Sequence, residues 1–367
     1  MDFFSLITLL GGLALFLYGM NVMGAGLEKM SGGKLEKILE TLTSNPIKAV
    51  LLGAGVTAVI QSSSATTVMV VGFVNSGIMK LSQAVGIIMG ANIGTTVTSW
   101  LLSLSGLQGD NFFIKMLKPS SFSPILAMIG IILCMSKKSD KKKDIGEILL
   151  GFAVLMYGME SMSGAVEPLA DVPEFTNILT MFHNPFLGVL AGAVLTAIIQ
   201  SSTASVGILQ TLAMSGVVSA NAAIYITLGQ NIGSCLTALL SSAGTSRNAK
   251  RASVIHLTFN SFGAIVFGIG MYIISMMRPD IAQSSINSFQ ISVFHTFFNV
   301  TNTLLLFPFA KQLVAFSGLI VRETGEEEEK TETKEDELPV LDERIFKSPT
   351  FALEVGVMEV VHMGKMA

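Results

Sequence analysis

The feature that most constrains this chain is a short polar stretch, residues 61–67 (QSSSATT), enclosed by apolar residues on both sides. Six of its seven side chains are polar and none carries a formal charge. Polar groups held in hydrocarbon are costly unless they find partners, so the stretch must pack against polar groups or line a wet cavity. It recurs as residues 200–205 (QSSTAS). We interpret the two copies as the floor of one binding site.

The composition predicts a membrane protein. Only 13% of the residues are charged, against about 25% in soluble domains, and the mean hydropathy is +0.64. We expect an all-α polytopic protein of the plasma (inner) membrane, in contact with lipid. The start MDFF lacks the basic region of a cleavable signal peptide, so the first apolar run should remain as a span. The sequence has no basic patch of the kind that binds nucleic acid, so we expect no nucleic-acid partner.

The chain repeats itself with an offset of 139 residues, from Gln61 to Gln200. The shared positions include Asn-Pro at 45–46 and 184–185, and Asn-Ile-Gly at 92–94 and 231–233. Repeats are the first organisation to look for in a chain. We predict repeat 1 over residues 1–136, a basic cytoplasmic loop over 137–144, and repeat 2 with the final spans over 145–320.

Each repeat is predicted to hold a re-entrant helical hairpin, at about residues 46–80 and 185–219. The first segment is too long and too polar in its middle for an ordinary span, although a straight helix with a polar stripe is the alternative. A broken transmembrane helix should follow, because the glycines of GANIG (90–94) and GQNIG (229–233) weaken a helix. An interfacial amphipathic helix is predicted over residues 28–43.

Charge sets the expected orientation. The run KKSDKKK at 137–143 marks the cytoplasmic side, which puts the N-terminus outside and the C-terminus in the cytoplasm. Arg247, Lys250 and Arg251 then fall inside without having been used to set the orientation. The first hairpin enters from the cytoplasm and the second from outside. The result is two inverted-topology repeats, the architecture of secondary transporters.

The two polar tips suit an anion and a small cation together. Helix N-termini favour anions, and hydroxyl groups can donate to an anion or offer a lone pair to a cation. Backbone carbonyls freed at residues 90–94 and 229–233 would suit Na⁺. The tips hold no Asp, Glu or His, which a proton-coupled carrier would be expected to use. This favours sodium over protons.

The paired QSS motifs, each followed by G-x-N-I-G-T/S, resemble the type II sodium/phosphate cotransporter family over about residues 1–318. The resemblance implies sodium-coupled symport of inorganic phosphate by alternating access, with Na⁺ as the coupling ion, no organic cofactor and no enzymatic activity. It implies phosphate binding by Gln61, Ser62, Ser63, Ser64, Thr66, Gln200, Ser201, Ser202, Thr203 and Ser205. For Na⁺ it suggests Asn92, Thr95, Thr96, Asn231 and Ser234. The second copy departs at Thr203 and Cys235, so the halves need not bind equally.

The C-terminal region is interpreted as two parts. Residues 321–338 form an acidic solvated linker, and residues 339–367 resemble the start of a PhoU-like helical domain that is cut short. This tail is compatible with a cytoplasmic partner, and the chain with a homodimer. The sequence leaves two other functions open, a sodium-coupled carrier of a dicarboxylate or sulfate, and a phosphate-sensing membrane scaffold. A serine hydrolase is disfavoured because the chain has no Gly-x-Ser-x-Gly elbow.

Two His-x-x-Phe-Asn motifs lie within apolar spans, His256 with Asn260 and His295 with Asn299. In each motif the His and the Asn are four residues apart and share a helix face. Hydrogen bonding between helices is the first interpretation. A place beside the transport pathway is the second.

Overall fold

The computed structural model describes residues 3–31, 45–106, 118–135, 140–168, 172, 177 and 179–322. Over these residues the regular elements are helices, apart from one isolated β-bridge between Ser219 and Ser285. Short 3₁₀ turns lie at Leu104–Gly106 and Phe307–Phe309. The α-helices are, in chain order, α1 (Phe3–Ser31), α3 (Pro46–Ile60), α4 (Ser63–Asn75), α5 (Leu81–Ser103), α7 (Pro119–Cys134), α8 (Asp140–Val166), α10 (Pro185–Ile199), α11 (Ser202–Met214), α12 (Ala220–Gly233), α13 (Cys235–Ser241), α14 (Arg247–Met277), α15 (Pro279–Ala282), α16 (Ser288–Leu306) and α17 (Ala310–Ile320).

Long apolar helices confirm the prediction of an all-helical, multi-pass chain. In the described part, six segments are long and apolar enough to cross a membrane: Phe4–Met30, Leu81–Gly106, Asp140–Val166, Ala220–Ser241, Arg247–Met277 and Ser288–Ile320. Four more helices are apolar but shorter, namely Pro46–Ile60, Ser63–Asn75, Ser121–Cys134 and Pro185–Ile199. Three of these short helices flank the two polar stretches.

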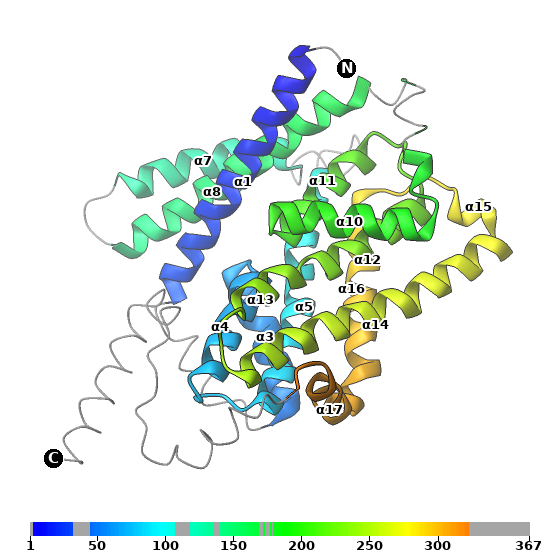
Figure 1. Ribbon diagram of the computed structural model, residues 1–367. Coiled ribbons are helices and arrows are strands. Elements are labelled where there is room, and N and C mark those ends of the chain that lie inside the picture. The colour runs from blue at the N-terminus through cyan, green and yellow to red at the C-terminus, as the bar shows by residue number, and fades with distance from the viewer. Residues whose placement is uncertain are drawn as a thin grey trace.

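Helices α1, α7 and α8 form one layer, at one edge of the molecule in Figure 1. Glycines let α1 and α8 approach to backbone contact. A Cβ added to Gly19 would lie 2.3 Å from the backbone nitrogen of Leu155, and one on Gly151 would lie 2.4 Å from that of Met23. Small residues at such an interface are typical of helices packed in lipid, where close van der Waals contact replaces the hydrophobic effect.

The first hairpin, α3 and α4, packs along α5. Here the glycines of α5 serve close packing, because a Cβ on Gly90 would lie 2.0 Å from the carbonyl oxygen of Val50 on α3. A Cβ on Gly94 would lie 2.5 Å from that of Ala54. The predicted break at residues 90–94 is therefore wrong, since α5 runs without interruption from Leu81 to Ser103.

The second copy packs in the same way but its helix is interrupted. A Cβ on Gly229 would lie 1.9 Å from the carbonyl oxygen of Val189 on α10. The interruption falls at Ser234, which separates α12 from α13. The predicted broken helix is thus found in the second copy alone, one residue beyond the glycine motif.

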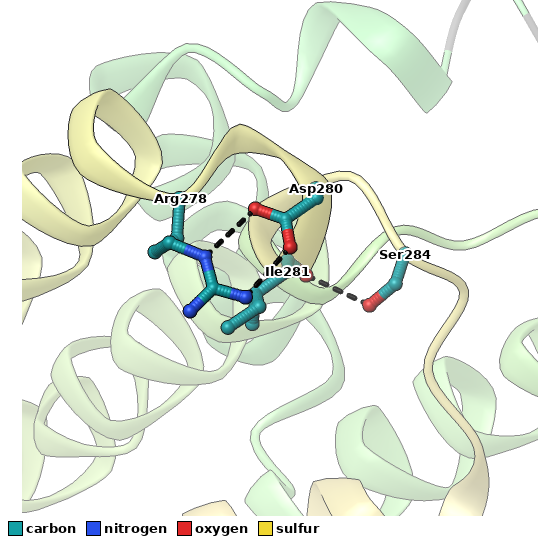
Figure 2. A network of polar contacts seen from close by, with 4 residues as sticks. All are labelled: Arg278, Asp280, Ile281 and Ser284. Carbon is teal, nitrogen blue, oxygen red and sulfur yellow. Dashed lines mark hydrogen bonds and ion pairs between the residues drawn. The ribbon is translucent and has the colours of Figure 1, made fainter.

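A short turn joins the long helix α14 to α15. Figure 2 shows Arg278 holding Asp280 through two contacts, Nε to Oδ1 at 3.1 Å and Nη2 to Oδ2 at 2.8 Å. This guanidinium lowers the pKa of the Asp280 carboxyl. The hydroxyl of Ser284 donates to the carbonyl of Ile281 at 2.7 Å, and the Ser284 carbonyl accepts the N–H of Ala220 at 2.9 Å. The turn is thereby tied to the start of α12.

Several expectations fall outside the described residues. These are most of the interfacial helix (32–44), nearly all of the acidic linker (323–338), the PhoU-like tail (339–367) and the start of the basic loop (137–139). Glu28 belongs to α1, and α8 already begins at Asp140. Three of the basic-loop lysines are therefore helical.

Candidate functional site

Each hairpin turns within two residues, a Gln followed by a Ser. Gln61 and Gln200 adopt left-handed backbone, with φ of 62° and 57°, and they are the only non-glycine residues to do so in the described ranges. Their N–H groups donate to the carbonyls of Thr57 and Thr196, each at 2.7 Å. Left-handed non-glycine residues are uncommon and cluster at functional sites. The same rare conformation at equivalent positions singles out both turns.

The Ser after each Gln starts the next helix. Ser62 caps α4 by accepting the N–H of Ala65 at 3.1 Å, and Ser201 caps α11 by accepting the N–H of Ala204 at 3.2 Å. The remaining N–H groups of a first turn have no acceptor within their own helix. Such a helix end carries about half a positive charge. Each turn therefore offers a partial positive charge and free donors.

The two turns meet at one cavity of about 570 Å³. The hydroxyl oxygens of Ser63 and Ser202 lie 3.5 Å apart. Helix α1 forms the third wall, where the Sδ of Met20 lies 3.9 Å from the Oγ of Ser201. The lining residues are Leu17, Met20, Asn21, Gly24, Ala25, Glu28, Ile60, Gln61, Ser62, Ser63, Ser64, Ala65, Ile199, Gln200, Ser201, Ser202 and Thr203. The cavity thus lies between the α1 layer and the two hairpins.

Most residues expected to bind phosphate lie at this cavity. The structure brings together Gln61, Ser62, Ser63, Ser64, Gln200, Ser201, Ser202 and Thr203. Thr66 and Ser205 are not among its lining residues and are fully buried one turn into α4 and α11. The Thr66 hydroxyl donates to the carbonyl of Ser62 at 3.1 Å, so it supports the turn from behind. That these residues bind phosphate stays a prediction.

The residues expected to bind Na⁺ do not line the cavity. In α5, the Asn92 amide and the Thr95 and Thr96 hydroxyls donate to carbonyls of their own helix, at 2.9, 3.0 and 2.7 Å. Asn231 and Ser234 in the second copy do the same, at 2.8 and 2.7 Å. All five side chains are buried. Their role as cation ligands stays a prediction.

The buried hydroxyls behind the first turn are paired. Thr57 donates to the hydroxyl of Thr66 at 3.0 Å, across the hairpin from α3 to α4. Thr98 of α5 donates to the side-chain oxygen of Gln61 at 2.7 Å. Gln61 is buried as a result, with 7% of its surface exposed. The first turn is therefore hydrogen-bonded to α5, the helix against which it packs.

The equivalent groups of the second repeat are unpaired. The hydroxyl oxygens of Thr196, Ser205 and Thr237 are buried and have no hydrogen-bond partner among the described residues. Gln230 donates to the Ser205 carbonyl at 2.9 Å, but its own side-chain oxygen is also unpaired. Thr196 lies against α12, where a Cβ on Gly233 would be 2.8 Å from the Thr196 Cβ. The four unpaired oxygens thus belong to four consecutive helices of the second repeat, α10, α11, α12 and α13.

The His-x-x-Phe-Asn pairs are fully inside the bundle. Asn260 donates to the carbonyl of His256 at 3.3 Å, and Asn299 to that of His295 at 2.9 Å. Each of these two bonds lies within one helix. Asn260 also donates to the sulfur of Cys235 on α13 at 3.2 Å, so the predicted hydrogen bonding between helices is found for this motif.

Sequence reasoning missed the wall that α1 contributes. Asn21 and Glu28 are its polar members, and both are exposed to the cavity region. Among the described lining residues, Glu28 is the one formally charged side chain. The signal available was Asn21, a polar residue inside an otherwise apolar run with glycines at helical spacing.

Comparisons with known proteins find similarity over most of the chain. A family model described as Na⁺/Pi-cotransporter matches residues 15–164 and again residues 154–298. The chain is 27% identical over 361 residues to the "Putative inorganic phosphate export protein YjbB" of Salmonella typhimurium, covering 98% of this chain and 63% of that protein. It is 29% identical over 311 residues to "Uncharacterized protein YqeW" of Bacillus subtilis, covering 83% and 95%.

A third relative is more distant in origin. The chain is 37% identical over 99 residues to "Sodium-dependent phosphate transport protein 2A" of Rattus norvegicus, covering 26% of this chain and 15% of that protein. The chain thus spans 63% of the length of the export protein that it matches. No solved structure matches the chain significantly.

Proposed function

The chain belongs to the Na⁺/Pi-cotransporter family, and on this premise we propose that it is a secondary transporter that couples Na⁺ to the movement of inorganic phosphate. The observation that carries the proposal is the single cavity between the two Gln-Ser turns. A transporter needs a central site that two moving elements share, and this cavity is bounded by both hairpins and by α1.

We propose that phosphate binds between Ser63 and Ser202. Free N–H groups at the starts of α4 and α11, together with the serine hydroxyls, supply the donors. Hydrogen bonds to a charged group contribute about 1.5–3 kcal/mol each. The cavity therefore has the means to hold an anion although none of its described lining residues is Lys or Arg.

We propose that the coupling Na⁺ binds in the second repeat. The oxygens of Thr196, Ser205, Gln230 and Thr237 are buried and unpaired. A buried polar group without a partner costs about 1–3 kcal/mol, so these oxygens favour a ligand that accepts several lone pairs at once. Hydroxyl and amide oxygens are suitable ligands for a hard cation. Asn231 and Ser234 lie on the same stretch of the chain, at the end of α12, and remain further candidates.

Alternating access follows from the arrangement if the repeats are inverted in the membrane. We propose that the hairpins are re-entrant and enter from opposite sides, with the N-terminus outside and the C-terminus in the cytoplasm. The polar composition of each turn supports the re-entrant path, because irregular backbone at membrane depth is tolerated only next to protein or water. The α1 layer would then move relative to the hairpins around the shared cavity.

Transport into proteoliposomes tests the proposal. We expect uptake of radiolabelled phosphate into vesicles that contain the purified chain, driven by an inward Na⁺ gradient and not by an equal K⁺ gradient. The double variant S63A/S202A should abolish uptake, while S285A, which removes an exposed hydroxyl in the turn after α15, should not. Equal uptake in K⁺ would refute sodium coupling. If unlabelled dicarboxylates or sulfate inhibit uptake of labelled phosphate more strongly than unlabelled phosphate does, the chain carries another anion.

A further inference from the structure

A buried polar cluster joins three helices away from the cavity. The side-chain nitrogen of Gln210, on α11, lies within hydrogen-bond distance of four oxygens. These are the carbonyl and the hydroxyl of Ser99 at 3.1 Å each, the hydroxyl of Ser292 at 2.9 Å and the carbonyl of Ser288 at 3.3 Å. The Ser288 hydroxyl donates in return to the Gln210 carbonyl at 3.1 Å. All four residues are at most 2% exposed. Helix α11 is thus hydrogen-bonded to α5 and to α16.

The amide of Gln210 is not needed to pack these helices. Its side-chain oxygen is buried and has no hydrogen-bond partner among the described residues, a cost that an apolar side chain would avoid. The repeats provide an internal comparison, because the offset of 139 relates Gln210 to Val71 and Ser99 to Ala238. Both of these equivalents are buried apolar residues. The amide in the second repeat therefore indicates a role other than close packing.

Helix α5 holds both hairpins through consecutive residues. Thr98 donates to the side-chain oxygen of Gln61 in the first turn at 2.7 Å, and Ser99 accepts the amide of Gln210. Gln210 follows Ser202 on α11 by about 12 Å along the helix axis. A helix of this length keeps its two ends in a fixed relation. The position of the second turn, like that of the first, is therefore set relative to α5.

We propose that Gln210 is a positioning residue, which holds the second Gln-Ser turn against the first through α5 so that Ser63 and Ser202 meet at the cavity. The inference rests on the proposed function, since it takes the two turns to be one binding site. The amide has two N–H groups and faces four acceptors, so it can exchange partners without leaving a donor unpaired. Directional bonds of this kind fix the register of α11 against α5, and they can form again after a movement.

The distance between the two hairpins tests the proposal. Leu51 on α3 and Leu190 on α10 are equivalent positions with 68% and 46% of their surfaces exposed, so both can carry a spin label. In L51C/L190C/C134S the remaining thiol, that of Cys235, is fully buried. Pulsed electron paramagnetic resonance of this protein in lipid nanodiscs gives the reference distance distribution. Adding Q210M, which keeps the length of the side chain and removes its N–H groups, should broaden or shift that distribution.

The matched control is T211V. Thr211 is the next residue on α11 and is 2% exposed, but its hydroxyl donates within its own helix, to the carbonyl of Gly207 at 2.9 Å. T211V should leave the distance distribution unchanged. If Q210M does not fold, S99A/S292A removes both hydroxyls that face the amide and should change the distribution in the same way. An unchanged distribution in the variant that folds, or an equal change in T211V, overturns the proposal.

Phosphate binding provides a second measurement, which a purely structural role would not alter. In calorimetric titrations at saturating Na⁺, Q210M should bind inorganic phosphate on the order of tenfold more weakly than the wild type, and T211V as tightly as the wild type. The melting temperature of Q210M should stay close to that of the wild type. Wild-type affinity in Q210M overturns the inference. If the wild type binds no phosphate while Q210M still changes the distance, the proposed function fails and the positioning of the turns by Gln210 stands.

Discussion

The two Gln-Ser turns share a backbone and differ in their side-chain bonding. Both have a left-handed Gln, a Ser cap and a short following helix. In the first turn the Gln side chain is buried and held by Thr98. In the second, Gln200 is exposed and the hydroxyl of Thr237, the equivalent of Thr98, is buried and unpaired. The backbone of the turn is therefore repeated, while the polar groups behind each turn differ in their hydrogen bonding.

This difference separates two requirements. Helix geometry and glycine packing determine where a turn lies, and both repeats meet that requirement equally. Of the equivalent hydroxyls behind the turns, only those of the second repeat are left unpaired within the described structure. We interpret the buried hydroxyls behind the first turn as structural and those behind the second as cation ligands, while both turns are proposed to donate to phosphate.

The largest expected effect on stability concerns the close glycine packing that both repeats share. Replacing Gly90 or Gly229 with Val puts a side chain within about 2 Å of a backbone oxygen (2.0 and 1.9 Å for the Cβ). Overpacking of this kind should destabilise either repeat by about 3 kcal/mol or more. Melting temperatures in detergent would measure it. The control is G55V, because nothing lies within 4 Å of a Cβ there and the equivalent residue is already Val194. A response from one repeat alone would break the comparison.

A second prediction concerns ligand binding by the two caps. S62A and S201A each remove a hydroxyl from the cavity, and each should weaken phosphate binding by about 1.5–3 kcal/mol. Titration calorimetry with phosphate would measure both. Because the cap hydrogen bond is also lost, melting temperatures of the same proteins should be compared with S62T and S201T, which keep it. Wild-type affinity in either Ala variant would contradict a site shared by both turns.

The third prediction separates the turns directly. Q61A should lower the free energy of unfolding by about 1–2 kcal/mol, because it leaves the Thr98 hydroxyl without its acceptor. Q200A should change it by less than about 0.5 kcal/mol, since an exposed side chain is removed. Chemical unfolding in detergent micelles would provide both values. Equal decreases in the free energy of unfolding for Q61A and Q200A would show that the different bonding of the two Gln side chains does not affect stability.

The smallest effect is expected behind the turns. T57V removes a paired hydroxyl, and should destabilise the chain by about 1 kcal/mol in Na⁺ and K⁺ alike. T196V removes an unpaired one, so it should be neutral in K⁺. We expect Na⁺ to raise the melting temperature of the wild type, and T196V should abolish that increase. Retention of the Na⁺ effect in T196V would place the cation elsewhere.

The positions of the turns could be predicted from the sequence. A run of neutral polar residues inside apolar helices has few acceptable environments, so the residues of QSSSATT and QSSTAS are enough to assign both stretches to a shared site. The repeat offset predicts equivalent positions for Gln61 and Gln200, and the structure gives both the same backbone conformation. In both stretches the dominant free-energy cost is that of a polar group without a hydrogen-bond partner. This cost depends on nearby residues, so it can be recognised from the local sequence.

Features that depend on packing against a helix distant in the sequence could not be predicted. A glycine pair such as Gly90 and Gly94 weakens a helix and also allows another helix to approach, and only the presence of α3 decides between the two. The sequence pattern places Glu28 in an interfacial helix, because charged residues at the end of a span are usually solvated there. Its position in the cavity wall depends on how α1 crosses both turns, and the one sequence feature of α1 that indicates this face is the polar residue Asn21.

One consequence follows from the 3.5 Å contact between Ser63 and Ser202. These atoms lie on α4 and α11, one in each repeat, so a molecule held by both would act as a removable cross-link between the two halves. Whether the cavity is occupied would then depend on the relative position of the two halves, and the reverse would also hold. Any movement that draws the halves apart releases the cargo, and any cargo that stays bound keeps them together.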